Sequence, residues 1–453
     1  MTALDLAAAI RRKEVSPVEV ASAYLARMDE LDPQLNAFCH RADDDVLKAA
    51  AAAEDAVARG SELPFLGVPL TVKDLVNVAG WPTRYGSAAT SNAPAAASDP
   101  VVQRFVDAGF VLLGKTTTSE FGAVPFTENE TSGISRNPWN PAHTPGGSSS
   151  GAGVSVAAGM APIAHAEDGG GSIRIPASCN GLVGLKPTRG LVTNLSVEVE
   201  GFGTSGVLTR DVASSAAVLD VIARHDPGAW WSPPTSSRSL SRDPGPLRIG
   251  VMIESPLDGI PVDPACREAV AGTLRTLESA GHHIVDTPLP LPPFAELLST
   301  FTVIWNAGAA AVPLADPSLV EPHNAQARSA ALATSSWAYV QAVHHAQELS
   351  RRILDGFLAH FDLLVTPTMA CLPPPVGFWR SGDNPLATSY PMAVFTALFN
   401  VTGQPAISLP VHHDAATNLP VGVQLVAAPW REDLLLQVAR TLEEAHPWAD
   451  RRP

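Results

Sequence analysis

Two glycine-rich stretches in the first half of the chain decide its fold. Residues 145–151 read PGGSSSG, and residues 168–176 read DGGGSIRIP. Because glycine tolerates positive φ, three glycines leading into Ser172 let successive backbone N–H groups turn toward one point. Such a nest can hold an oxyanion, and it places the Ser172 hydroxyl beside the carbonyl that it would attack.

The sequence around these stretches is unusual over a longer range. Residues 128–190 are rich in Gly, Ser, Thr, Asn and Pro and show few amphipathic patterns. A long loop-like segment inside a compact protein is usually functional, so we expect a functional loop region here. Upstream, residues 67–74 read GVPLTVKD, which predicts a short apolar strand that ends on Lys73.

Farther out, strands alternate with helices. Ser16–Glu19 is a capping box with proline at the first helical position. We expect further helices at 47–59, 100–108, 263–280 and 432–444, a mostly helical segment at 294–361, and strands at 110–113, 247–252, 282–286, 362–367 and 421–426. This alternation predicts an α/β protein with a largely buried, mixed sheet.

Charge and composition exclude several classes of protein. The formal net charge is −15, with 45 acidic and 30 basic residues, which disfavours contact with nucleic acid or an anionic membrane surface. The longest weakly polar stretch, Gly151 to Ala166, is too short and too glycine-rich to span a bilayer. The N-terminus does not read as a signal peptide. Since the four cysteines (Cys39, Cys179, Cys266 and Cys371) form no C-x-x-C pair, we expect free thiols and a cytoplasmic protein.

The stretch from Ser148 to Gly190 resembles the signature of the amidase signature family. The resemblance covers nearly the whole chain, because further family motifs are matched in the right order outside this stretch: Gly67–Asp74, Glu120–Phe121, Asn137–Trp139, Leu247–Gly281, Asn400–Ala406 and Gly422–Gln424. It implies an α/β/α sandwich with a large central mixed β-sheet flanked by helices. It also implies a stand-alone, bacterial-type amidase that needs no cofactor and no metal.

The resemblance assigns roles residue by residue. It implies that Ser172 is the nucleophile, that Ser148 is a bridging serine after a cis peptide bond, and that Lys73 is the general base. The amides of Gly169, Gly170, Gly171 and Ser172 would form the oxyanion hole, with Asp168 and Arg174 as supporting polar partners. A lysine base must be neutral, against an ordinary pKa of about 10.4. Burial on an apolar strand shifts the pKa of lysine in that direction.

The same residues have less specific interpretations. The serines and glycines could form a surface loop of small residues, and Lys73 alone could be a solvated lysine at a strand end. Asp168 and Arg174 could be an ordinary buried ion pair, and Cys179 is best interpreted as a buried, inert thiol.

Two other motifs match in letters but not in context. Gly109–Thr116 fits the phosphate-loop pattern, yet its four middle residues are bulky and apolar and predict a strand. Residues 147–151 fit the nucleophile-elbow pattern, with His412 or His413 as base, but prolines precede them where a strand is required. His412-His413-Asp414 lacks the spacing of metal ligands, and we expect a polar loop there.

We expect one domain over residues 1–453. Its signature core would cover about 65–225, followed by an exposed connection at 226–246. The C-terminal half, 247–453, would complete the sheet and the substrate pocket.

The predicted activity is hydrolysis of the C–N bond of small, largely apolar aryl or alkyl amides, with carbamates as a further class, by a monomer or homodimer. The expected pocket walls are Gly122, Ala123 and Val124 with the following Pro125-Phe126, Leu195–Gly203, and the helical stretch containing Trp305 and Trp337, although these tryptophans could instead be core residues. Two alternatives are the glutamine amidase subunit of a tRNA-dependent amidotransferase and a catalytically inactive scaffold on the same fold.

Overall fold

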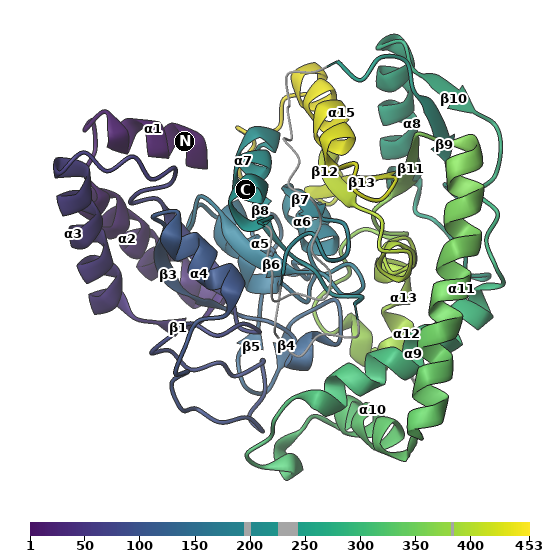
Figure 1. Ribbon diagram of the computed structural model, residues 1–453, viewed down its shortest axis with the longest axis horizontal. Helices are drawn as coiled ribbons and strands as arrows, with labels where there is room; N and C mark the ends of the chain where they lie inside the picture. The colour runs from purple at the N-terminus through teal and green to yellow at the C-terminus, as the bar shows by residue number, and fades with distance from the viewer. Residues whose placement is uncertain (194–200, 225–242, 382–384) are drawn as a thin grey trace.

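A central β-sheet of 11 strands organises the protein (Figure 1). The computed structural model describes residues 1–193, 201–224, 243–381 and 385–453. The strands of the sheet are β1 (Phe38–Arg41), β2 (Pro69–Lys73), β3 (Val111–Thr116), β6 (Ala164–Glu167), β7 (Val183–Lys186), β8 (Ser205–Thr209), β9 (Arg248–Val251), β10 (His283–Val285), β11 (Leu363–Pro367), β12 (Ala406–Asp414) and β13 (Leu419–Ala427). The short strands β4 (Glu128–Asn129) and β5 (Gly133–Ile134) form a separate pair.

The order of the strands mixes the two halves of the chain. The order is β1-β3-β2-β6-β8-β7-β12-β13-β11-β9-β10, with β2 parallel to β3 and β6, β9 parallel to β10 and β11, and the remaining neighbours antiparallel. Strands from both halves therefore belong to one mixed sheet, as the sequence predicted. The division into a single domain with a core at 65–225 stays a prediction, and most of the predicted connection at 226–246 lies outside the described residues.

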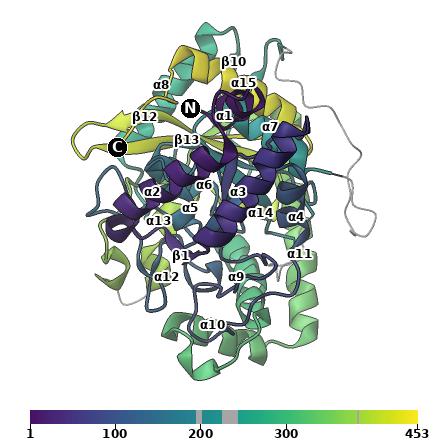
Figure 2. The ribbon, with the colours of Figure 1, turned by 90° about the vertical axis from the view of Figure 1, so that its left-hand side faces the viewer.

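Helices cover both faces of the sheet, which confirms the α/β/α architecture (Figures 1 and 2). One face packs against α4, α7, α8 and α15, while α5 and α6 pack on the other face near its centre and α2 and α3 near its N-terminal edge. The longer helices are α1 (Ala3–Arg11), α2 (Pro17–Leu35), α3 (Asp43–Ala58), α4 (Pro100–Asp107), α5 (Ser150–Ala157), α6 (Arg174–Asn180), α7 (Val212–Ile222), α8 (Pro264–Ser279), α9 (Phe294–Ala311), α10 (Pro322–Ala333), α11 (Ser336–His360) and α15 (Glu432–Ala445). Short helices complete the set: η1 (Glu120–Gly122), η2 (Pro317–Leu319), η3 (Phe378–Ser381), α12 (Pro385–Thr388), α13 (Tyr390–Ala393) and α14 (Leu398–Val401).

The glycine- and serine-rich segment 128–190 is not the loop that the sequence predicted. It contains α5, β6, α6 and β7, and every residue of these four elements is buried. A Cβ on Gly151 would collide with the carbonyl oxygen of Ala37, and a Cβ on Gly153 would lie 2.5 Å from the Asn180 side chain. The small residues therefore allow close packing of buried elements, which removes the amphipathic pattern that predicts a helix.

Three other local predictions can be compared with the structure. Ser16 and Glu19 form the capping box of α2, with Pro17 in its first turn. The phosphate-loop match forms strand β3 through Thr116, and its Lys115 is buried 2.9 Å from the Asp74 carboxylate. The prediction of a polar loop at residues 412–414 is wrong, because these residues form the end of β12.

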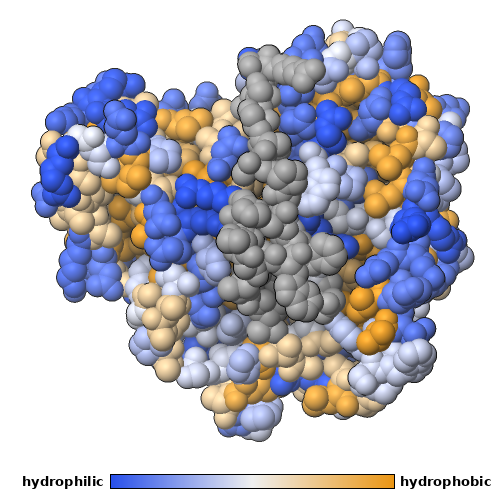
Figure 3. Space-filling model, viewed as in Figure 1, coloured by the Kyte–Doolittle hydropathy of each residue, from blue (hydrophilic) through white to orange (hydrophobic). Residues whose placement is uncertain are grey.

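The helices α9, α10 and α11 form a layer beside the sheet, at the lower right in Figure 1. On the face drawn in Figure 3, hydrophobic residues are interspersed with hydrophilic ones. Within the described residues, the helices are all too short or too polar to cross a membrane.

Candidate active site

Lys73, Ser148 and Ser172 line one cavity, although they come from three separate elements. Lys73 is the last residue of β2, Ser148 precedes α5, and Ser172 lies in the turn between β6 and α6. Tyr85 and Val312 line the same cavity. We call it the lysine cavity. The structure therefore brings the three predicted side chains to one cavity.

Lys73 and Ser148 are in direct contact. Lys73 Nζ lies 2.8 Å from Ser148 Oγ and donates to the carbonyl oxygen of Glu167 at 3.3 Å. The peptide bond between Gly147 and Ser148 is cis. Lys73 is 1% exposed, and this burial lowers its pKa to about 8, against the opposing charges of Glu167 and Asp168. A substantial fraction of neutral lysine is therefore present at mildly alkaline pH.

The turn before Ser172 carries the backbone amides predicted for the oxyanion hole, and its residues Gly169 and Ser172 line the lysine cavity. The amides of Gly169, Gly170 and Ser172 have no hydrogen-bond partner among the described residues, and neither does the Ser172 hydroxyl. The Gly171 amide differs from the predicted set, because it donates to Asp168 Oδ1 at 2.7 Å. Three amides, rather than four, are thus available to an oxyanion.

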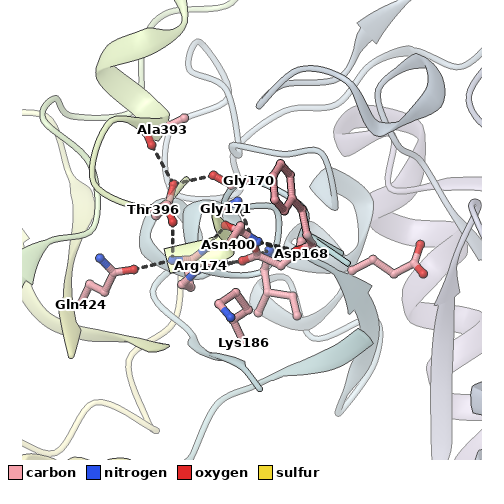
Figure 4. Close-up of polar contacts among 12 residues, drawn as sticks. Asp168, Gly170, Gly171, Arg174, Lys186, Ala393, Thr396, Asn400 and Gln424 are labelled. Atoms are coloured by element: carbon pink, nitrogen blue, oxygen red, sulfur yellow. Dashed lines mark hydrogen bonds and ion pairs between the residues drawn. The ribbon is translucent and has the colours of Figure 1, made fainter. Parts of the chain in front are cut away.

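Asp168 and Arg174 form a buried ion pair beside this turn (Figure 4). Arg174 donates to Asp168 through Nε and Nη2, at 2.9 and 2.8 Å. The Ile173 amide donates to the same carboxylate at 3.1 Å. Burial alone would raise the pKa of Asp168, but the charge and hydrogen bonds of Arg174 outweigh it and hold the pKa well below its usual range. The ionised carboxylate therefore fixes the turn that carries Ser172.

Arg174 also reaches the C-terminal half of the chain, as Figure 4 shows. Its guanidinium donates to Gln424 Oε1 at 2.6 Å, to Asn400 Oδ1 at 2.6 Å and to the Thr396 carbonyl at 2.9 Å. Thr396 Oγ1 in turn donates to the Gly170 carbonyl at 2.7 Å. The sequence assigned no site role to these three residues, although two of them lie in the matched motifs 400–406 and 422–424.

Ser172 also lines a second cavity. It is lined mainly by apolar side chains, among them Leu298 and Phe301 of α9 and Val394. We call it the α9 cavity. Gly122, Ala123, Ser172 and Trp305 line both cavities, and Val124 lines the α9 cavity. The predicted wall residues Gly122 and Ala123 therefore lie where the two cavities meet, and Val124 lies in the wall of the α9 cavity.

The two predicted tryptophans have different positions. Trp305 stacks on Phe301, with ring centroids 5.1 Å apart, and lies over Gly169. The placement of Trp337 in the pocket wall is wrong, because it is 71% exposed on α11 and lines neither cavity. It is not a core residue either. Much of the predicted wall at Leu195–Gly203 lies outside the described residues.

Three further ionisable groups lie in or near this region: Tyr85, Glu167 and Cys179. Tyr85 and Glu167 line the lysine cavity, and burial raises the pKa of Tyr85 to about 12. Cys179 is fully buried 3.7 Å from the Met369 sulfur, and burial raises the pKa of its thiol well above the ordinary value. The protonated thiol is a poor nucleophile.

Comparisons with known proteins agree with this geometry. A family model described as Amidase matches residues 19–436. The chain is 36% identical to 6-aminohexanoate-cyclic-dimer hydrolase of Paenarthrobacter ureafaciens over an alignment 476 positions long, which covers 98% of this chain and 94% of the relative. The solved structure of 6-aminohexanoate cyclic dimer hydrolase complexed with substrate has a TM-score of 0.92 and 34% identity, over 100% of this chain and 98% of that one. Native peptide amidase from Stenotrophomonas maltophilia has a TM-score of 0.84 and 28% identity, over 98% and 97%.

Proposed function

The chain belongs to the amidase signature family and is a hydrolase of amide bonds, and we propose that it cleaves small, largely apolar amides through an acyl-enzyme on Ser172. The observation that carries this proposal is the 2.8 Å contact between Lys73 Nζ and Ser148 Oγ in a cavity that Ser172 also lines. A buried lysine with a lowered pKa is a suitable base for a serine nucleophile.

The proposed reaction has two halves. Ser172 Oγ attacks the amide carbonyl, and its proton passes through Ser148 to neutral Lys73. The amides of Gly169, Gly170 and Ser172 stabilise the oxyanion. The proton then returns through Ser148 to the nitrogen, the C–N bond breaks, and the amine leaves. Water attacks the acyl-enzyme by the same proton route and releases the carboxylic acid.

The α9 cavity supports the proposed preference for apolar substrates. Its described lining is mostly aliphatic and aromatic, and no arginine lines either cavity within the described residues. A substrate carboxylate would therefore lack the bidentate partner that arginine supplies. Carbamates present a similar carbonyl carbon to the nucleophile, so they form a second proposed substrate class.

A substrate comparison tests this proposal. We expect kcat/KM for an anilide or an aryl carbamate to exceed that for glutamine and asparagine by about tenfold or more, because burial of apolar surface contributes about 0.8 kcal/mol per methylene. The measurement is initial rates with the isolated chain. A tenfold preference for glutamine would contradict the apolar pocket and would favour the glutamine amidase alternative. Labelling of Ser172 by a fluorophosphonate excludes an inactive scaffold.

The pKa of Lys73 gives a pH dependence. Lys73 must be neutral to accept the proton, and its pKa lies at about 8. We therefore expect kcat/KM to rise from acid pH and to level off above about pH 8. Below the pKa of Lys73 its neutral fraction increases about tenfold per pH unit, and above the pKa nearly all of the lysine is neutral. A pH–rate profile between pH 5 and 10 measures this limb. A maximum below pH 6 would contradict a lysine base.

We also propose a cytoplasmic setting and a small-molecule substrate as the only required partner. All four cysteines are free, which suits a reducing compartment. The monomeric or homodimeric state stays a prediction, which sedimentation of the purified chain tests.

A further inference from the structure

The two cavities meet at the nucleophile, so the two halves of a bound amide can each occupy one of them. Ser172, Gly122, Ala123 and Trp305 line both, whereas Lys73, Tyr85 and Ser148 line only the lysine cavity within the described residues. Gly169 lines the lysine cavity and Gly170 lines the α9 cavity. The predicted oxyanion amides thus straddle the junction.

We infer that the substrate binds in one direction, with its acyl group in the α9 cavity and its amine in the lysine cavity. This inference rests on the proposed function. It identifies the substrate class as amides of apolar carboxylic acids, and it makes Leu298 and Val312 residues that determine specificity for the two halves of the substrate.

The proton route fixes the direction. The nitrogen of the leaving amine must lie about 2.6–3.2 Å from the group that returns its proton. That group is Ser148, whose hydroxyl is held 2.8 Å from Lys73 Nζ. Since Ser148 lines only the lysine cavity among the described residues, the nitrogen lies on that side of Ser172.

The acyl group then has one direction left. The carbonyl carbon carries the oxygen, the nitrogen and the acyl chain in one plane. The oxygen points to the amides of Gly169, Gly170 and Ser172, and the nitrogen points to Ser148. The acyl chain therefore leaves on the opposite side, where Leu298, Phe301 and Val394 line the α9 cavity.

The side chains of the two cavities suit these assignments. The α9 cavity has little polar lining, so it favours an alkyl or aryl acyl group. The lysine cavity carries Tyr85, Glu167 and Lys73, so it accepts the nitrogen and polar groups attached to it. An apolar chain on the nitrogen would desolvate these polar groups, whereas the same chain on the carbonyl would not.

Two isomeric amides separate the two directions. N-methylheptanamide carries its chain on the acyl side, and N-hexylacetamide carries a chain on the amine side. We expect kcat/KM to be at least about tenfold higher for N-methylheptanamide, because its methylenes enter the apolar cavity. N-methylacetamide, which has neither chain, reports the chemistry alone.

A reciprocal pair of variants then tests each cavity. Leu298→Trp fills the α9 cavity and is expected to lower kcat/KM for N-methylheptanamide at least about tenfold while sparing N-hexylacetamide. Val312→Phe narrows the lysine cavity and is expected to lower kcat/KM for N-hexylacetamide at least about tenfold while sparing N-methylheptanamide. Leu332→Trp, at a position that is 79% exposed on α10, is the matched control and should change kcat/KM for neither isomer. A circular dichroism spectrum and a urea midpoint that match those of the parent chain confirm that each variant is folded.

The outcomes distinguish the two levels of the proposal. The opposite pattern, or an equal loss for both isomers in each variant, would overturn the assigned direction while leaving hydrolysis through an acyl-enzyme on Ser172 intact. If the parent chain hydrolyses none of the three amides and resists the fluorophosphonate, the proposed function itself fails, and the direction fails with it.

Discussion

Replacing Ser172 by alanine is expected to lower kcat by about 10⁴-fold or more, because covalent catalysis is lost and only the oxyanion-binding amides remain. The hydroxyl lines the cavity without a partner among the described residues, so its loss should leave the fold unchanged. The measurement is single-turnover hydrolysis of an anilide, together with fluorophosphonate labelling, which the variant should lose completely.

Removing the proton route should have a similar consequence. Lys73→Met keeps the volume of the buried side chain but removes the base, and Ser148→Ala breaks the 2.8 Å contact with Lys73. Each is expected to lower kcat by about 10²–10⁴-fold, the range for general acid–base catalysis. Ser149→Ala is the matched control, because its hydroxyl donates to the Glu167 carbonyl at 3.2 Å and lines neither cavity. Activity near the parent level in Lys73→Met would exclude the proposed base.

The second large effect is expected from Arg174→Met. This change leaves the fully buried Asp168 carboxylate without its cationic partner and removes hydrogen bonds to Thr396, Asn400 and Gln424. Breaking one partner of a buried ion pair typically costs about 3–5 kcal/mol. We expect the free energy of unfolding to fall by about that amount, measured by urea denaturation, with kcat also lowered because the Ser172 turn loses its support.

A surface pair provides the comparison. Arg248 pairs with Asp362 at 3.0 Å, but both side chains are partly exposed, at 47% and 34%. Arg248→Met should therefore change the urea midpoint only slightly, because solvent screens exposed pairs. If Arg174→Met were as stable as Arg248→Met, the network in Figure 4 would not support the site. Arg174→Lys, which keeps the charge but not the planar fork, should fall between the two.

Local sequence carried most of the proposed chemistry. The glycines before Ser172, the serine at 148 and the strand ending on Lys73 each have a short pattern, and the family resemblance relates them. Asn400 and Gln424 lie in matched motifs, but neither they nor Thr396 revealed a role, because each acts through a contact with Arg174, more than 200 positions away. The hydrogen bond from the Gly171 amide to Asp168 was also not predictable, because the sequence does not determine where the Asp168 side chain points.

The fold was predictable where hydrophobic periodicity is strong. The strands around β9, β11 and β13 and the helices α8 and α15 lie close to their expected bounds. The prediction failed at α5 because Ser150–Ala157 is buried on every side, so its sequence has no polar face. It failed at Trp337 because the local sequence does not distinguish an aromatic side chain on the surface from one that lines a pocket.

The order of the strands in the sheet has a consequence for folding during translation. Ribosomes make Arg174 long before Asn400 and Gln424, which follow it by 226 and 250 positions. Because β12 and β13 lie between β7 and β11, the growing polypeptide cannot complete its sheet until its last strands have been translated. A nascent chain that ends before residue 400 therefore contains Ser172 and Lys73 but lacks the hydrogen bonds from Arg174 to Asn400 and Gln424. Hydrolytic competence should arise only near the end of translation.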